Sequence, residues 1–139
     1  MEHAENARCI EDLLASCPGF QPHWDEHRAW WGDRAGLMLD LAVFGEYAAQ
    51  AIRRGEPAEL AALAGSSERL LGSESKAVRD AAVTGFLAGL MNRCSTDAEH
   101  MPFERLARQL GPVALAACRR LDEELGTRTP GLWEPDAAA

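Results

Sequence analysis

The sequence predicts an all-α fold, a compact bundle or short stack of about six to seven helices in a single domain. Apolar residues recur at spacings of three and four through most of the chain, and no segment shows the alternation of a strand. Glycine and proline divide the sequence into pieces of helical length. The 139 residues fit one domain, at residues 1–126, followed by an irregular C-terminal tail at residues 127–139.

The first two helices are expected at residues 4–17 and 22–31. In the first, the apolar positions 10, 13, 14 and 17 share one face, and the Pro-Gly pair that follows ends the helix. In the second, Pro22 suits the first helical position and Gly32 stops the helix.

The third helix, at residues 34–54, carries the clearest signals. Asp33 can cap its N-terminus. Arg53 and Arg54 lie in the last turn, where positive charge favours the helix dipole, and Gly55 follows as the residue that ends the helix.

Two apolar stripes run along this third helix. The main stripe consists of Leu37, Leu41, Phe44, Ala48 and Ile52, and the second consists of Leu39, Val43 and Tyr47. Such a helix is either central, with neighbours on both sides, or carries an exposed patch. We favour the central position, although the second stripe would also suit a homodimer.

The remaining helices are expected at residues 57–71, 74–93, 102–110 and 113–125. Prolines open the fourth, sixth and seventh helices, and Ser73 is a candidate cap for the fifth. A ridge of small residues in the fifth helix should let another helix backbone approach closely, which would offset the roughly 1 kcal/mol that each glycine costs. The ridge consists of Ala81, Gly85, Ala88 and Gly89.

The net charge of −8 is concentrated in the first third of the chain. Residues 1–50 hold nine acidic and three basic residues, whereas the rest of the chain is closer to balance. The acidic excess disfavours nucleic-acid binding, which needs a basic surface. It permits a basic protein partner, although acidity also serves solubility.

The ends of the chain and its cysteines indicate a cytoplasmic protein. No apolar run reaches the roughly 18 residues of a membrane-spanning helix, and the acidic N-terminus lacks the basic start of a secretory signal. Without export, the four cysteines are expected to be reduced and to behave as small apolar side chains. We expect no membrane partner and no cofactor.

The sharpest motif matches H-x-x-E-H, the zinc motif of inverzincin peptidases, and reads His23-Trp24-Asp25-Glu26-His27. The two histidines could share a metal on one helical face, with Glu26 as general base. The residues available as a third ligand are Asp40, Glu46 and His100. The short helix, the small chain and the lack of a third-ligand motif favour ordinary surface or helix-cap histidines, and we expect no bound metal.

Trp30 and Trp31 form the second notable feature. Adjacent residues on a helix point about 100° apart, so one core contact cannot bury both equally. Trp24 and Trp31 share a face and are expected to anchor the short helix on the core, with Trp30 partly exposed. In the alternative interpretation, Trp30 is an interface anchor.

No nucleophile, nucleotide-binding or dithiol motif occurs in the chain. The acidic run Asp122-Glu123-Glu124 is interpreted as a solvated helix face. We therefore expect a protein without enzymatic activity.

One region resembles a known family. The residues that carry the resemblance are Trp31-Gly32-Asp33, Leu39-Asp40-Leu41, Phe44-Gly45-Glu46-Tyr47, Arg54-Gly55-Glu56, Glu59-Leu60, Leu70-Leu71-Gly72, Val78-Arg79-Asp80-Ala81-Ala82, Thr84-Gly85-Phe86-Leu87 and Leu90. Over residues 31–92 the chain resembles an uncharacterised family of small bacterial α-helical proteins, some of which are found near polymorphic toxin genes and are suspected immunity proteins. The resemblance implies a helical fold and includes no catalytic signature.

Small size, the lack of catalytic motifs, the clustered acids and the resemblance together predict a non-enzymatic protein-binding module. We expect an immunity- or antitoxin-like inhibitor that binds a basic toxin or effector domain through its acidic first third. The residues expected to contact the partner are Asp25, Glu26, Trp30, Asp33, Asp40 and Glu46. Two alternatives remain open, a small zinc hydrolase centred on His23, Glu26 and His27, and a helical adaptor in a complex without a toxin.

Overall fold

The computed structural model describes residues 2–133, which form helices and connecting segments without a strand, so the predicted all-α class is confirmed. With the unbroken stretch of residues 76–96 taken as one helix, the described residues form seven helices. No helix among them is both long and apolar enough to cross a membrane. The helices are α1 Glu2–Ser16, α2 Gln21–Trp31, α3 Leu37–Arg54, α4 Pro57–Leu71, α5 Lys76–Ala81, α6 Ala88–Thr96, α7 Glu104–Ala107 and α8 Pro112–Leu125; a short 3-10 turn, η1 Pro18–Phe20, precedes α2, and a π-helical segment, η2 Ala82–Leu87, joins α5 to α6.

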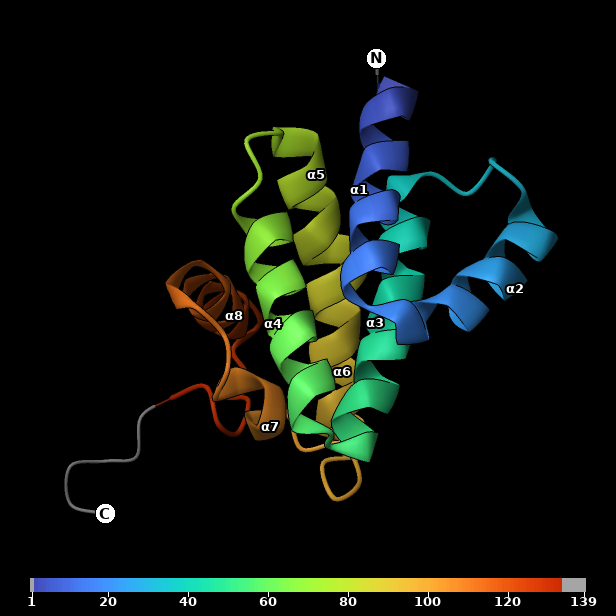
Figure 1. Cartoon of the computed structure of the whole chain (residues 1–139). Coiled ribbons are helices and arrows are strands. Elements are labelled where there is room, and N and C mark those ends of the chain that lie inside the picture. Colours follow the sequence, from blue (N-terminus) through green and yellow to red (C-terminus); the bar gives the residue numbers. More distant parts are fainter. Residues whose placement is uncertain (1, 134–139) are drawn as a thin grey trace, which may run out of the picture.

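Helix α3 lies at the centre of the fold, and α2 lies on the outside of the bundle (Figure 1). The α5–η2–α6 stretch, α4 and α2 all pack against α3, while α1, α7 and α8 pack against α4. Both predicted stripes of α3 have buried members, Phe44 in the main stripe and Tyr47 in the second. The central position predicted for this helix is therefore confirmed.

The N-terminus of α3 differs from the prediction. The helix begins at Leu37, and Gly36 occupies the capping position, whereas Asp33 lies exposed in the preceding turn. Gly32 and Gly36 have φ values of 61° and 84°, a conformation that glycine adopts without steric cost. At these two positions the chain changes direction between α2 and α3. Arg34, which lies between them, donates hydrogen bonds to the carbonyl oxygens of the last two residues of α2.

The tightest helix contact joins α3 to η2. A Cβ atom on Gly85 would clash with the carbonyl oxygen of Met38, and one on Gly45 would lie 3.1 Å from the carbonyl oxygen of Phe86. Close packing through small residues is therefore confirmed at Gly85. The prediction is wrong for Gly89, which is exposed and has open space around its missing side chain, because the wider π-helical turn shifts the register of the residues that follow it.

Alanine is expected to have opposite effects at these two positions of one helix. Gly85→Ala should lower the free energy of unfolding by about 1–3 kcal/mol, because the added methyl group must push two helix backbones apart. Gly89→Ala should raise it by about 0.5–1 kcal/mol, since alanine is the better helix former at an open site. Urea unfolding monitored by circular dichroism measures both values, and equal effects would contradict the close approach of η2 to α3.

Further helix ends differ from the prediction, and the α5–η2–α6 stretch ends at Thr96 rather than at the expected residue 93. Ser75, rather than Ser73, caps α5 by accepting a hydrogen bond from the backbone N–H of Val78 at 3.2 Å. Helix α7 is confined to Glu104–Ala107, shorter than the expected residues 102–110. The chain after α7 tightens into hydrogen bonds of i to i+3 spacing before the Gly-Pro pair that opens α8.

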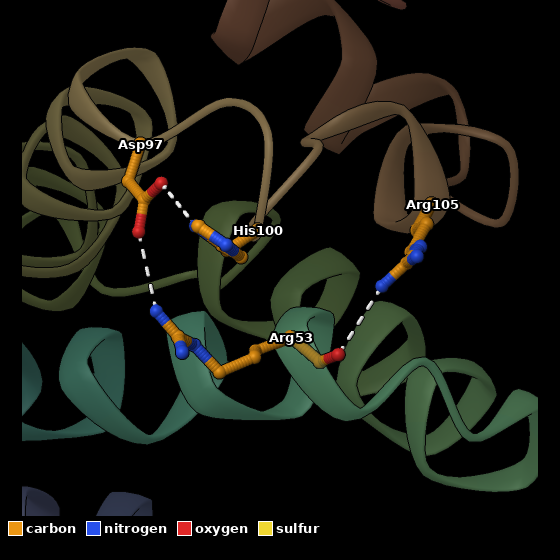
Figure 2. Close-up of polar contacts among 4 residues, drawn as sticks. All are labelled: Arg53, Asp97, His100 and Arg105. Atoms are coloured by element: carbon orange, nitrogen blue, oxygen red, sulfur yellow. Dashed lines mark hydrogen bonds and ion pairs between the residues drawn. The ribbon is translucent and has the colours of Figure 1, made fainter.

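The loop after α6 is tied to the C-terminus of α3 (Figure 2). Asp97 accepts a hydrogen bond from Arg53 at 3.2 Å, and its other oxygen lies 2.8 Å from the ring nitrogen Nδ1 of His100. Arg105 donates to the carbonyl oxygen of Ile52 at 2.8 Å and to that of Arg53 at 3.2 Å. These carbonyl groups belong to the last turn of α3, where the helix itself offers no donor.

Residues 127–133, the described part of the predicted irregular tail, contain no helix and pack closely on α8. Leu132 and Thr129 are buried, and Asp122 of α8 is only 1% exposed. The Asp122 carboxylate accepts hydrogen bonds from Thr127, Thr129 and Trp133. The expected solvated face is therefore wrong for this residue, although the next two acids of the run are exposed. Residues 134–139 of the predicted tail lie outside the described residues.

Candidate protein-interaction site

Helices α2 and α3 form an antiparallel hairpin that carries the residues predicted to bind a partner. Near the start of α2, at the end away from the connecting turn, the rings of His23 and Tyr47 lie 5.8 Å apart. In its middle, His27 Nε2 lies 2.7 Å from Asp40 Oδ1, and the His27 side chain is 6% exposed. A polar pair this well shielded holds α2 in one position against α3.

A groove of about 330 Å³ lies between α2 and α3 on one side of this hairpin. We call it the tryptophan groove. Its apolar lining comes from Trp30 and Trp31 of α2 and from Leu39, Ala42 and Val43 of α3. Trp30 is 77% exposed, Trp31 is 38% exposed and Leu39 is 42% exposed. A cluster of large apolar side chains around a hollow is typical of interaction surfaces.

The charged side chains that line the tryptophan groove, among the described residues, are both acidic. Glu26 comes from α2 and Glu46 from α3, and His23 and His27 are the other titratable side chains of the lining. Glu46 lies 3.1 Å from Arg93 of α6, and both side chains are about half exposed. Such an exposed pair contributes little stability, so Glu46 can exchange this partner for another at small cost.

A second groove, of about 510 Å³, lies on the other side of α2, between α1, α2 and α3. We call it the α1 groove. Its lining is mixed in charge, because Arg28 lies among Glu11, Asp33 and Asp40. The guanidinium group of Arg28 is placed over the Trp24 ring at 5.7 Å from the ring centroid. An internal cation thus already occupies the aromatic wall of this groove.

The six residues predicted to contact a partner do not form one surface. The structure brings Glu26, Trp30 and Glu46 together in the tryptophan groove and places Asp33 and Asp40 in the α1 groove. Asp25 lines neither groove and accepts a hydrogen bond from Gln21 at 2.8 Å. Helix α2 has only eleven residues, and each of its two sides faces a groove. Acidic residues that are close together in the sequence therefore lie on different sides of the helix.

Two further groove residues, Trp31 and Leu39, were missing from the predicted contact set. Trp24 packs against Phe20 as expected, with ring centroids 6.0 Å apart. Trp31 does not reach the core as expected, because α2 ends there and the chain turns away at Gly32. The sequence signal for Leu39 was its place in the second apolar stripe of α3. Helix α2 covers Tyr47 in this stripe but leaves Leu39 exposed.

The H-x-x-E-H segment is not arranged as a metal site. His27 is engaged with Asp40, and His23 packs on Tyr47. His100 is paired with Asp97 near Arg53, and thirteen residues of α3, about 20 Å, separate that end of the helix from Asp40. The part of the chain that the structure describes holds no group of three metal-ligating side chains. This geometry gives the zinc-hydrolase alternative no support.

The cysteine thiols are also poorly suited to nucleophilic chemistry. All four are free, and Cys17, Cys94 and Cys118 are buried. Burial raises the pKa of Cys9 to about 11 and the pKa values of Cys94 and Cys118 to about 12. At neutral pH these groups therefore remain thiols, and the reactive thiolate is scarce.

Comparison with known proteins places the chain in a family. No curated protein and no solved structure matches it significantly. A family profile described as a domain of unknown function, DUF7674, matches residues 10–124. That range is wider than residues 31–92, over which the resemblance was noted, and it includes α2, α3 and most of the lining of both grooves. The chain therefore belongs to the DUF7674 family.

Proposed function

We propose that the protein is a non-enzymatic binding module, an immunity- or antitoxin-like inhibitor of a basic toxin or effector domain. The observation that carries the proposal is the exposure of Trp30, at 77%, beside Trp31 and Leu39 on the open edge of the tryptophan groove. A tryptophan this exposed gives little to folding, whereas tryptophan buried at an interface contributes strongly to binding.

The acidic first third supports a basic partner. Asp25, Glu26 and Asp33 are exposed on or beside α2, so their charge is available for steering a basic protein toward the site. Asp40 is a weaker candidate than the sequence suggested, because it holds His27 and its side chain is 17% exposed. We therefore assign the steering role to the exposed acids and a structural role to Asp40.

Separate variants test the charges and the tryptophan against a partner captured from a bacterial lysate and then purified. Reversal of Asp25 and Glu26 to lysine should slow association, mainly at low salt, because steering acts on the encounter. Trp30→Ala should cost about 2 kcal/mol or more of binding energy, felt as faster dissociation. Surface plasmon resonance at two salt concentrations separates the two effects. Val113→Ala, at an exposed apolar site on α8, is the matched control and should change neither rate.

The inhibitor role has its own test. Stoichiometric addition of the protein should suppress the toxic or catalytic activity of the captured partner, and Trp30→Ala should weaken that suppression. A partner that binds with the same affinity to wild type, to the Asp25 and Glu26 charge reversal and to Trp30→Ala would contradict the proposed surface. A partner whose activity is unchanged on binding would favour the helical adaptor instead.

A further inference from the structure

We infer that the tryptophan groove accepts about two turns of a partner α-helix that carries an apolar stripe flanked by lysine or arginine. This inference rests on the proposed function and specifies which part of the surface binds and what kind of segment it binds. It follows from the length of the groove, the character of its floor and the sign of the charges on its two walls.

The length and shape of the groove fit a short helical segment. Its lining spans residues 23–31 of α2 and residues 39–46 of α3, and at 1.5 Å per residue these stretches are about 10–12 Å long, or two helical turns. On the floor, Ala42 lies among larger apolar neighbours. A small residue between larger ones on a helix leaves a depression that a side chain of a third helix can fill.

The charges select a basic segment. Glu26 stands on the α2 wall and Glu46 on the α3 wall, and the described lining contains no lysine or arginine. A helix lying between the walls would therefore meet Glu26 on one flank and, in exchange for its exposed ion pair with Arg93, Glu46 on the other. The α1 groove is a poorer site for the same segment, because Arg28 already lies over the Trp24 ring and would repel a second cation.

A second copy of this chain is a poorer occupant than a basic helix. A symmetric dimer through the groove would bring the same patch of each copy together, so Glu26 and Glu46 would approach the equivalent acids of the other copy. The net charge of −8 adds to that repulsion. The homodimer considered from the second stripe of α3 is therefore not the arrangement that this groove favours.

A designed peptide provides a defined probe. It has about 15 residues, enough for a marginally stable helix, with leucine on one face and lysine on both flanks. Its controls are a scrambled peptide of the same composition and a peptide with glutamate in place of lysine. Titration into isotope-labelled protein, followed by NMR, should give saturable shifts of the Trp30 and Trp31 indole signals with the first peptide only.

Matched variants locate the binding. Leu39→Glu, at a site that is already 42% exposed, should weaken binding by about 10-fold or more, since it places a charge in the apolar floor. Glu26→Gln with Glu46→Gln should weaken it several-fold at low salt and less at high salt. Glu123→Gln with Glu124→Gln, which removes the same number of exposed charges from α8, far from the groove in the sequence and in neither groove lining, should leave it unchanged.

Three outcomes would overturn the inference: shifts centred on the Trp24 indole, equal binding of the scrambled peptide, or insensitivity to Leu39→Glu. These failures are distinct from failure of the proposed function. A captured partner that depends on Asp25, Glu26 and Trp30 but tolerates Leu39→Glu would retain the function and reject the groove. A peptide that binds in the groove of a protein that suppresses no partner would retain the groove and reject the inhibitor role.

Discussion

Asp122→Ala is expected to lower the free energy of unfolding by about 3–5 kcal/mol, because it removes the shared acceptor of a buried hydrogen-bond network. Oδ1 of Asp122 accepts hydrogen bonds from the hydroxyl groups of Thr127 and Thr129, each at 2.7 Å. Oδ2 accepts from the Thr129 backbone N–H at 2.7 Å and from Trp133 Nε1 at 3.0 Å. Alanine would leave both N–H donors without an acceptor, at about 1–3 kcal/mol each where they stay buried.

Asp122→Asn is the matched variant and should lower the free energy of unfolding by only about 1 kcal/mol. The hydrogen bonds remain, but they are weaker because their acceptor is no longer charged. The asparagine oxygen can take the place of Oδ2 and accept from both N–H groups. Its amide group then donates to the two threonine hydroxyls, which are able to rotate and accept. Urea unfolding at neutral pH measures both variants. Equal losses for alanine and asparagine would contradict this account of the network.

The same network predicts a dependence of stability on pH. Burial alone would raise the pKa of Asp122, but the hydrogen bonds from Thr129, Thr127 and Trp133 together hold this pKa below its ordinary value. A carboxyl whose pKa is lower in the folded state adds stability above its unfolded pKa of about 4, and this stability is lost as the pH falls through the folded pKa. Asp122→Asn should therefore show a smaller loss of stability between neutral and acidic pH than wild type.

Phe44→Ala and Phe86→Ala are each expected to lower the free energy of unfolding by about 3–5 kcal/mol. Both side chains are 0% exposed, and their ring centroids lie 5.1 Å apart. Phe44 also packs edge-on against Phe20, with ring centroids 5.0 Å apart. Because these rings fill the space between η1, α3 and η2, their removal leaves a cavity that rigid helix backbones cannot close.

The two substitutions should not be additive. The rings are in contact, so the double variant should lose less than the sum of the single losses, with a coupling of about 0.5–1.5 kcal/mol. Thermal and urea unfolding provide the measurements. Trp30→Ala is the control, since a residue 77% exposed should change stability by no more than about 0.5 kcal/mol. A large loss for Trp30→Ala would place that ring in the core and remove the basis of the proposed binding surface.

Much of the secondary structure was readable from the sequence because its signals are local. Helix α4 has the predicted bounds, opened by Pro57 and closed before Gly72, and α3 ends at Arg54 with Gly55 in the left-handed conformation. Proline restricts φ to a helical value, and glycine, which has no Cβ atom, tolerates a positive φ. Both effects are local and do not depend on tertiary contacts. The exposure of Trp30 next to a less exposed Trp31 also follows locally, since adjacent helical residues point in different directions.

By itself, the sequence determined the all-α class, most helix ends to within two residues, and the clustering of acids and tryptophans in the first third of the chain. Only the tertiary structure decided that Asp122 is buried, that Gly85 and not Gly89 meets a backbone, and that Asp40 holds His27. It also divided the predicted contact residues between two sides of α2. The physical reason is that helical periodicity assigns residues to faces, whereas the neighbour that each face meets depends on segments distant in the chain. In the sequence, the acidic run of α8 has the pattern of a solvated face. In the fold, Thr129 and Trp133 pack against α8 and donate hydrogen bonds to Asp122.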